Sequence, residues 1–137
     1  MTNIPIEGGC LCGAIRYRAT AQPERRSICH CRTCRLAAGA STVAWVVFPA
    51  DTFEITRGTP NAYESSPGVT RTFCGRCGTS LTYQSSDARD TVDVTTASLD
   101  RADDFPPKVE IWTAQRLRWE SLHPELPHYP GSSRGQD

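Results

Sequence analysis

The alternation of apolar and polar residues along the chain predicts a domain built mainly from short β-strands. In residues 14–18 the apolar Ile15 and Tyr17 alternate with arginines, which is the period of a strand with one buried face. Residues 42–48 form a run rich in valine and aromatic residues, which suits a strand buried on both faces. Further strands are expected at residues 52–56, 69–73, 80–84, 91–95 and 109–113. The pattern predicts a mainly β fold with antiparallel sheets and few short helices.

Helical signals are confined to two short segments. Residues 32–38 are expected to form a short helix that ends at Gly39, and residues 98–101 a single turn. Prolines recur in the segment that starts at His123, so this segment is expected to be extended and to fray over residues 131–137. A length of 137 residues predicts a single domain over residues 1–137.

Cysteine is the unusual residue in the composition, because there are seven, an odd number, in three clusters. The N-terminus lacks the basic start and apolar run of a secretory signal, so we expect a cytoplasmic protein. In a reducing compartment, clustered cysteines are metal ligands or catalytic thiols more often than disulfides. The clusters are Cys10-Leu11-Cys12, Cys29-His30-Cys31-Arg32-Thr33-Cys34 and Cys74-Gly75-Arg76-Cys77.

The first and third clusters have the spacing of one closed zinc site. Structural zinc takes four ligands in a tetrahedron, and each two-cysteine turn supplies one edge of it. A glycine follows each turn, and glycine can adopt the conformation that lets backbone N–H groups turn back on the sulfurs. We therefore expect a structural zinc site formed by Cys10, Cys12, Cys74 and Cys77.

The middle cluster then has three cysteines, Cys29, Cys31 and Cys34, and no fourth. Three protein ligands with an open position are typical of catalytic zinc. Three thiolates would leave this zinc with a net negative charge, which makes it a poor generator of hydroxide and suits it to a soft fourth ligand such as an incoming thiol. We therefore expect a second zinc ion here, labile or catalytic.

Three other residues near this cluster are candidates for a role in the site. His30 lies between two ligating cysteines, where reaching the same metal would strain the chain, so a supporting, substrate-facing or general-acid role is favoured over that of a fourth ligand. Arg32 and Arg35 could offset the negative charge and contact an anionic thiol, or they could belong to a solvated face.

The charge balance bears on the partners. Fifteen basic and fifteen acidic residues give a formal net charge of zero, which argues against a nucleic-acid or anionic-membrane surface. Seven thiolates and two zinc dications would lower this charge to about −3, which makes nucleic acid a still weaker candidate. No stretch approaches the ~20 apolar residues that cross a bilayer. The sequence does not indicate an oligomeric state.

The cysteine motifs and the residues around them resemble the glutathione-dependent formaldehyde-activating enzyme family, in order and over nearly the whole chain. The family also contains the chromatin-associated centromere protein V. The resemblance implies a β-tent fold over two zinc ions, with the structural and catalytic ligands divided as above. The segments that carry it are residues 9–17, 29–35, 73–79, 98–100 and 126–130.

The reaction assigned to the family's named member joins glutathione and formaldehyde into S-hydroxymethylglutathione and is classed as a carbon–sulfur lyase reaction. The resemblance thus implies a zinc-dependent lyase whose partners are a small thiol such as glutathione and an aldehyde. Two alternatives remain open. One is a non-catalytic zinc-binding module for a protein or small-ligand partner, and the other is a redox sensor in which a zinc thiolate is the nucleophile.

Overall fold

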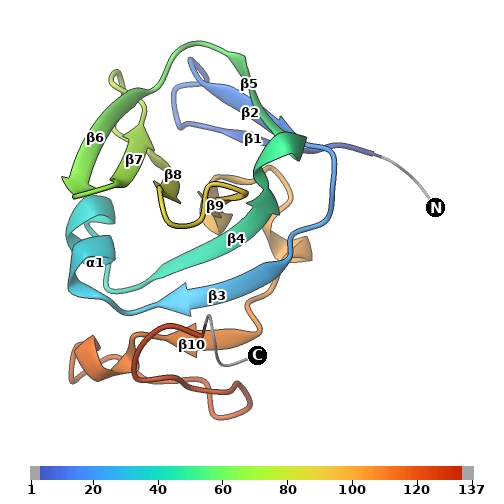
Figure 1. The fold of residues 1–137 in the computed structure, drawn as a ribbon. Helices are drawn as coiled ribbons and strands as arrows, with labels where there is room; N and C mark the ends of the chain where they lie inside the picture. Colours follow the sequence, from blue (N-terminus) through green and yellow to red (C-terminus); the bar gives the residue numbers. More distant parts are fainter. Residues whose placement is uncertain (1–3, 134–137) are drawn as a thin grey trace.

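The computed structural model describes residues 4–133, which form two β-sheets and one short α-helix (Figure 1). In chain order the strands are β1 (Ile6–Gly9), β2 (Arg16–Ala19), β3 (Arg25–Cys29), β4 (Val43–Pro49), β5 (Phe53–Arg57), β6 (Asn61–Ser66), β7 (Val69–Phe73), β8 (Ser80–Ser85), β9 (Thr91–Thr95) and β10 (Val109–Ile111). The smaller sheet has the order β1-β2-β5 and the larger the order β10-β3-β4-β9-β8-β7-β6. All pairs are antiparallel except β10 with β3. The prediction of a mainly β fold is confirmed.

The run of valines and aromatic residues forms β4, which is buried on both faces as predicted. Val46 and Phe48 belong to the main core with Tyr17 of the smaller sheet. Val43 and Trp45 belong to a second cluster, which also contains cysteines. Burial of a side chain such as Phe48 contributes about 1.5–3 kcal/mol, so the strand that carries this second cluster is firmly anchored.

Helix α1 (Arg32–Ala38) spans the predicted residues and begins inside the middle cysteine cluster. The sulfur of Cys31 caps it by accepting a hydrogen bond from Cys34 N. Gly39, in the left-handed conformation at φ 66°, ends it and donates its N–H to Arg35 O at 2.7 Å. The expected turn at residues 98–101 lies earlier, at Thr96–Ser98, because Leu99 N donates to Thr96 O.

The patterning did not predict β1, β3 and β6. Strand β3 begins with two arginines, yet it lies between β4 and β10 in the larger sheet. Strand β6 is polar and largely exposed at the edge of this sheet, so no alternation of apolar residues identifies it. Strand β1 contains two glycines, which are poor strand formers.

The C-terminal segment lies in an extended conformation beside β10 (Figure 1). Glu110 N donates to Pro127 O, and Tyr129 N donates back to Glu110 O. Residues 131–137 were expected to fray. Within this segment Gly131 O accepts a hydrogen bond from Trp112 N, and residues 134–137 lie outside the described residues.

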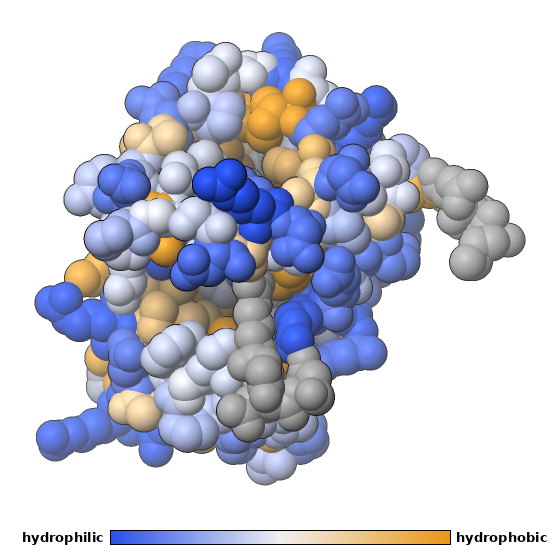
Figure 2. Space-filling model, viewed as in Figure 1, coloured by the Kyte–Doolittle hydropathy of each residue, from blue (hydrophilic) through white to orange (hydrophobic). Residues whose placement is uncertain are grey.

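The surface of the face drawn in Figure 2 is mostly hydrophilic, with apolar residues gathered in a few small areas. Within residues 4–133, no helix is long and apolar enough to cross a membrane.

Candidate metal centre and active site

The first and third cysteine clusters meet in space. Cys10 and Cys12 lie in the turn between β1 and β2, and Cys74 and Cys77 in the turn between β7 and β8. Cys12 and Cys74 are 62 residues apart in the chain, but their sulfurs lie 3.8 Å apart. All four Sγ atoms lie within 4.8 Å of one another. Four sulfurs at these distances are compatible with a zinc ion.

Two glycines shape these turns as the sequence predicted. Gly13 and Gly78 have φ of 79° and 85°, in the left-handed region that favours glycine. Gly13 N donates to Cys10 O at 3.1 Å, and Gly78 N donates to Cys74 O at 2.8 Å. Both turns are therefore tight, and each holds its two cysteines on the same side.

In this four-sulfur site hydrogen bonds lower the pKa of Cys10 and Cys77, whereas at Cys12 a backbone hydrogen bond is outweighed by burial and the contacts with the other three sulfurs, which raise its pKa to about 11. Ile15 N donates to Cys10 Sγ at 3.2 Å. The Thr79 hydroxyl lies 3.2 Å from Cys77 Sγ, and this hydrogen bond is the largest cause that lowers the pKa of Cys77, to about 5. Because thiolates are the metal-binding form, the site is prepared for a cation.

Cys29, Cys31 and Cys34 form a second group, which we call the triad. Cys29 ends β3, and the other two residues lie at the start of α1. Their sulfurs also lie within 4.8 Å of one another, and among residues 4–133 no histidine nitrogen or carboxylate oxygen joins them. All seven cysteines are free thiols. The structure therefore divides them into a group of four and a group of three, and a fourth position at the triad is available to a ligand.

Protons are shared unequally among the triad sulfurs. Hydrogen bonds from the thiols of Cys29 and Cys34 hold the pKa of Cys31 well below its usual range. The same contacts raise the pKa of Cys29. The backbone N–H of Cys34 also donates to Cys31 Sγ, at 3.3 Å. One sulfur is therefore a thiolate at neutral pH, and all-sulfur donors suit a soft or borderline cation such as zinc.

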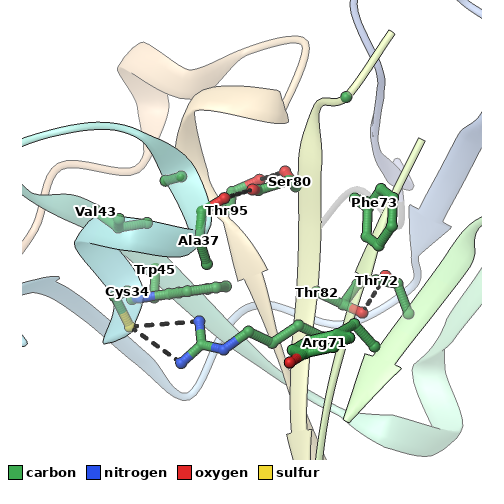
Figure 3. A pocket seen from close by; sticks show the side chains of 13 residues that line it. Cys34, Ala37, Val43, Trp45, Arg71, Thr72, Phe73, Ser80, Thr82 and Thr95 are labelled. Carbon is green, nitrogen blue, oxygen red and sulfur yellow. Dashed lines mark hydrogen bonds between the residues drawn. The ribbon is translucent and has the colours of Figure 1, made fainter. Parts of the chain in front are cut away.

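The buried cation at the triad is Arg71, which the sequence analysis did not identify. Both terminal nitrogens of its guanidinium lie 3.6 Å from Cys34 Sγ (Figure 3). Its Nε donates to Ser65 Oγ at 3.1 Å, and its Cζ lies 5.0 Å from the centre of the Tyr83 ring. The signal for this residue was its position in a predicted strand, since alternation places Arg71 on the same face as Val69.

Arg32 and Arg35, the arginines that the sequence favoured, lie elsewhere. Arg32 is exposed, and its backbone N–H donates to Gln115 Oε1 at 2.9 Å. Arg35 NH2 donates to Gln115 O at 3.3 Å. Neither residue lines the pocket at the triad. In the structure both residues tie α1 to the turn at Thr113–Gln115.

His30 is fully buried and faces away from that pocket. Its Nε2 lies 2.6 Å from Oε1 of Glu110, which is also buried. The second oxygen of Glu110 accepts the backbone N–H of His123 at 2.5 Å. Burial alone would raise the pKa of Glu110, but these hydrogen bonds outweigh it and the pKa is lowered. His30 therefore supports the backbone between two triad cysteines, and it is not among the residues that line the triad pocket.

A pocket of about 320 Å³ opens at the triad sulfurs. Its rim includes Trp112, a bulky residue held in the left-handed conformation at φ 56°. Such backbone strain is found mostly at functional sites. The wall also contains the apolar or aromatic residues Trp45, Val69, Tyr83 and Ile111, and it includes six polar side chains: Thr33, Ser66, Arg71, Asp93, Gln115 and Ser132.

Comparison with known proteins gives three findings. The sequence profile of the glutathione-dependent formaldehyde-activating enzyme family matches residues 5–115. A Schizosaccharomyces pombe protein named as an uncharacterized lyase is 35% identical over 85 residues, which are 56% of this chain and 56% of that protein, so the match spans little more than half of either. The crystal structure of a Rhodobacter sphaeroides protein has the same fold, with a TM-score of 0.58 and 18% identity over 89% of this chain and 98% of that one.

Proposed function

The chain belongs to the glutathione-dependent formaldehyde-activating enzyme family, and on that premise we propose that it is a zinc-dependent carbon–sulfur lyase that acts on adducts of a thiol with an aldehyde. The thiol is glutathione or a similar small thiol, and S-hydroxymethylglutathione is the simplest adduct. One observation carries the proposal. The triad presents three sulfurs, with no fourth protein ligand among the described residues, at the wall of an open pocket.

The two cysteine groups have different roles in this proposal. The four-sulfur site would hold a structural zinc that joins the β1–β2 turn to the β7–β8 turn. The triad would hold a second zinc, which when bound supplies a soft Lewis acid that favours the thiolate form of a thiol substrate. The structural assignment rests on four donors that close the site, and the catalytic one on three donors that leave it open.

In the forward reaction the substrate sulfur attacks the carbonyl carbon of the aldehyde. An S–C bond forms, the C=O π bond breaks, and the proton lost by the thiol ends on the oxygen. Negative charge therefore develops on that oxygen, and Arg71 is the charged donor that lies beside the triad to stabilise it. The reverse reaction returns the proton to sulfur and releases thiol and aldehyde.

Two supporting features keep the site in place. The His30–Glu110 pair holds the backbone that carries Cys29 and Cys31. The polar side chains within the pocket wall are suitable partners for a thiol such as glutathione, whose carboxylates and amides need hydrogen bonds.

The proposal is tested by exchange NMR with ¹³C-formaldehyde and glutathione, because the uncatalysed addition is itself fast and only a rate can reveal catalysis. We expect the zinc-loaded protein to accelerate exchange between free formaldehyde and S-hydroxymethylglutathione. The Cys31→Ser variant should lose this acceleration and keep its far-UV circular dichroism spectrum. Exchange rates that are equal with and without the wild-type protein would contradict the proposal, whatever the variant does.

A further inference from the structure

A second pocket, of about 300 Å³, adjoins the triad and has no role in the steps above. It lies between α1 and strands β4, β7 and β8 (Figure 3). Three residues, Cys34, Trp45 and Arg71, line both this pocket and the triad pocket. The Arg71 guanidinium and the Cys34 thiol, which contact each other, therefore form part of the boundary between the two pockets.

The wall of the second pocket is largely hydrocarbon. Ala37 and Ala38 of α1 line one side, and Trp45 and Phe73 line others. Arg71 is the one charged residue in the wall among the described residues. A pocket of this size, mostly apolar with one fixed polar group, has the character of a small-molecule site.

The threonine and serine hydroxyl groups in the wall already form hydrogen bonds within the protein. Thr72 and Thr82 share a hydrogen bond of 2.5 Å. Thr95 Oγ1 donates to Ser80 O at 2.8 Å, and Ser80 Oγ donates to Ala37 O at 3.1 Å. These groups therefore add little polarity, and a ligand with its own charges would lose hydration here without replacement. Apart from Arg71, the wall therefore disfavours the charged ends of glutathione.

We infer that the second pocket holds the hydrocarbon substituent of the aldehyde, and that the aldehyde is therefore an aromatic or branched aliphatic one. This inference rests on the proposed function. Formaldehyde has no substituent and would leave the pocket unfilled, whereas a phenyl or branched alkyl group would bury apolar surface against Trp45 and Phe73. The carbonyl oxygen would lie toward Arg71, the residue that borders both pockets. The reaction is the same balanced addition of a thiol to C=O.

The magnitude of the effect follows from the chemistry of the pocket. When two substrates differ by one methylene that enters an apolar pocket, an enzyme prefers the larger substrate by about 10–200-fold in rate. Because formaldehyde is more electrophilic than benzaldehyde, the two aldehydes cannot be compared directly in rate. The measurement is therefore the ratio of benzaldehyde to formaldehyde exchange with glutathione, followed across variants of one protein.

Ala37→Phe fills the second pocket from the exposed helix α1, where a larger side chain need not disturb the core. Its matched control is Leu36→Phe, because Leu36 is 65% exposed on the same helix and lines neither pocket. We expect Ala37→Phe to lower the benzaldehyde-to-formaldehyde ratio by at least ~10-fold and Leu36→Phe to leave it unchanged within ~2-fold.

A second readout needs no catalysis. Benzyl alcohol, an unreactive analogue, should shift the ¹H–¹⁵N NMR signals of Thr82 and Ala38 in the wild type but not in Ala37→Phe. Two results would overturn the inference and leave the proposed function intact, provided that formaldehyde exchange is accelerated as expected. One is that benzyl alcohol shifts neither NMR signal in the wild type. The other is that Ala37→Phe leaves the benzaldehyde-to-formaldehyde ratio unaltered. If the protein accelerates exchange with neither aldehyde, the proposed function is overturned and this inference with it.

Discussion

The guanidinium of Arg71 lies against the thiol of Cys34, with both terminal nitrogens 3.6 Å from Sγ. The two residues come from β7 and α1, 37 positions apart in the chain. A buried arginine is stable only beside compensating negative charge or hydrogen-bond acceptors, and Arg71 has the Cys34 sulfur and the Ser65 hydroxyl as partners. Three thiolates around a zinc dication would carry one net negative charge, which Arg71 would balance.

Replacement of Arg71 by methionine should separate catalysis from folding. Methionine keeps much of the hydrocarbon stem but removes the guanidinium, which faces Cys34 and lies over the Tyr83 ring. We expect formaldehyde exchange to fall by about 10²–10³-fold, as for the loss of one oxyanion donor. Exchange NMR and thermal unfolding measure the two effects. Arg57→Met, at an exposed position remote from the triad, is the control, and an equal loss of activity in both variants would exclude a specific role for Arg71.

The two cysteine groups should respond differently to a single serine. Cys12→Ser breaks the site that joins two distant turns, so we expect a Tm lower by well over 10 °C, since structural zinc supplies folding energy directly. Cys31→Ser should lose the second metal with a smaller loss of Tm. Thermal unfolding of both variants under the same zinc concentration measures the difference. An equal loss of Tm in both variants would indicate that the triad is a structural site and would favour a non-catalytic zinc-binding module.

The His30–Glu110 pair should give the protein an acid-sensitive contribution to stability. The pKa of Glu110 is lowered in the folded state, so its contribution is full above the unfolded value of about 4.5 and is lost as pH falls through the lower, folded value. Glu110→Gln should therefore be less stable than wild type at pH 7, by about 1.5–3 kcal/mol, because hydrogen bonds to a buried carboxylate are replaced by hydrogen bonds to a neutral amide. The difference in unfolding free energy between wild type and Glu110→Gln should narrow below pH 4.5. Urea unfolding of both proteins from pH 3 to 7 measures it, and a gap that is constant with pH would contradict the assignment.

The left-handed conformation of Trp112 should contribute to binding of the thiol substrate and not to stability. Its φ of 56° strains an aromatic residue, and glycine relieves this strain, so Trp112→Gly should leave the unfolding free energy unchanged or raise it by about 1 kcal/mol. The KM for the thiol should rise several-fold because a wall of the triad pocket is lost. Trp119→Gly, at a 72% exposed position outside that pocket, is the matched control. A KM that is unchanged in Trp112→Gly would exclude a role in binding.

The sequence predicted the division of the cysteines because ligand spacing is a local property. The sequence also predicted the bounds of α1, β7 and β9, because these follow from local capping and alternation. The other strands that the pattern predicted differ at their ends by one or two residues. Strand β3 was missed because its register is set by pairing of Ser27 with both Trp45 and Val109.

The missing parts of the site depend on tertiary contacts. His30 and Glu110 are 80 residues apart in the chain, and no spacing rule joins them. Proximity along the chain favoured Arg32 and Arg35, but neither lines the pocket, and both are hydrogen-bonded to Gln115, Arg32 through its backbone N–H and Arg35 through its guanidinium. Arg71 reaches the triad because β7 lies opposite α1 in the folded protein (Figure 3).

Native mass spectrometry with and without glutathione tests the central claim most directly, because it counts metal ions and bound thiol in one spectrum. The account predicts two zinc ions in the wild type and a glutathione adduct that disappears in Cys31→Ser together with one zinc. A wild-type protein that binds one zinc, or a Cys31→Ser variant that keeps both zinc ions and the adduct, would contradict it.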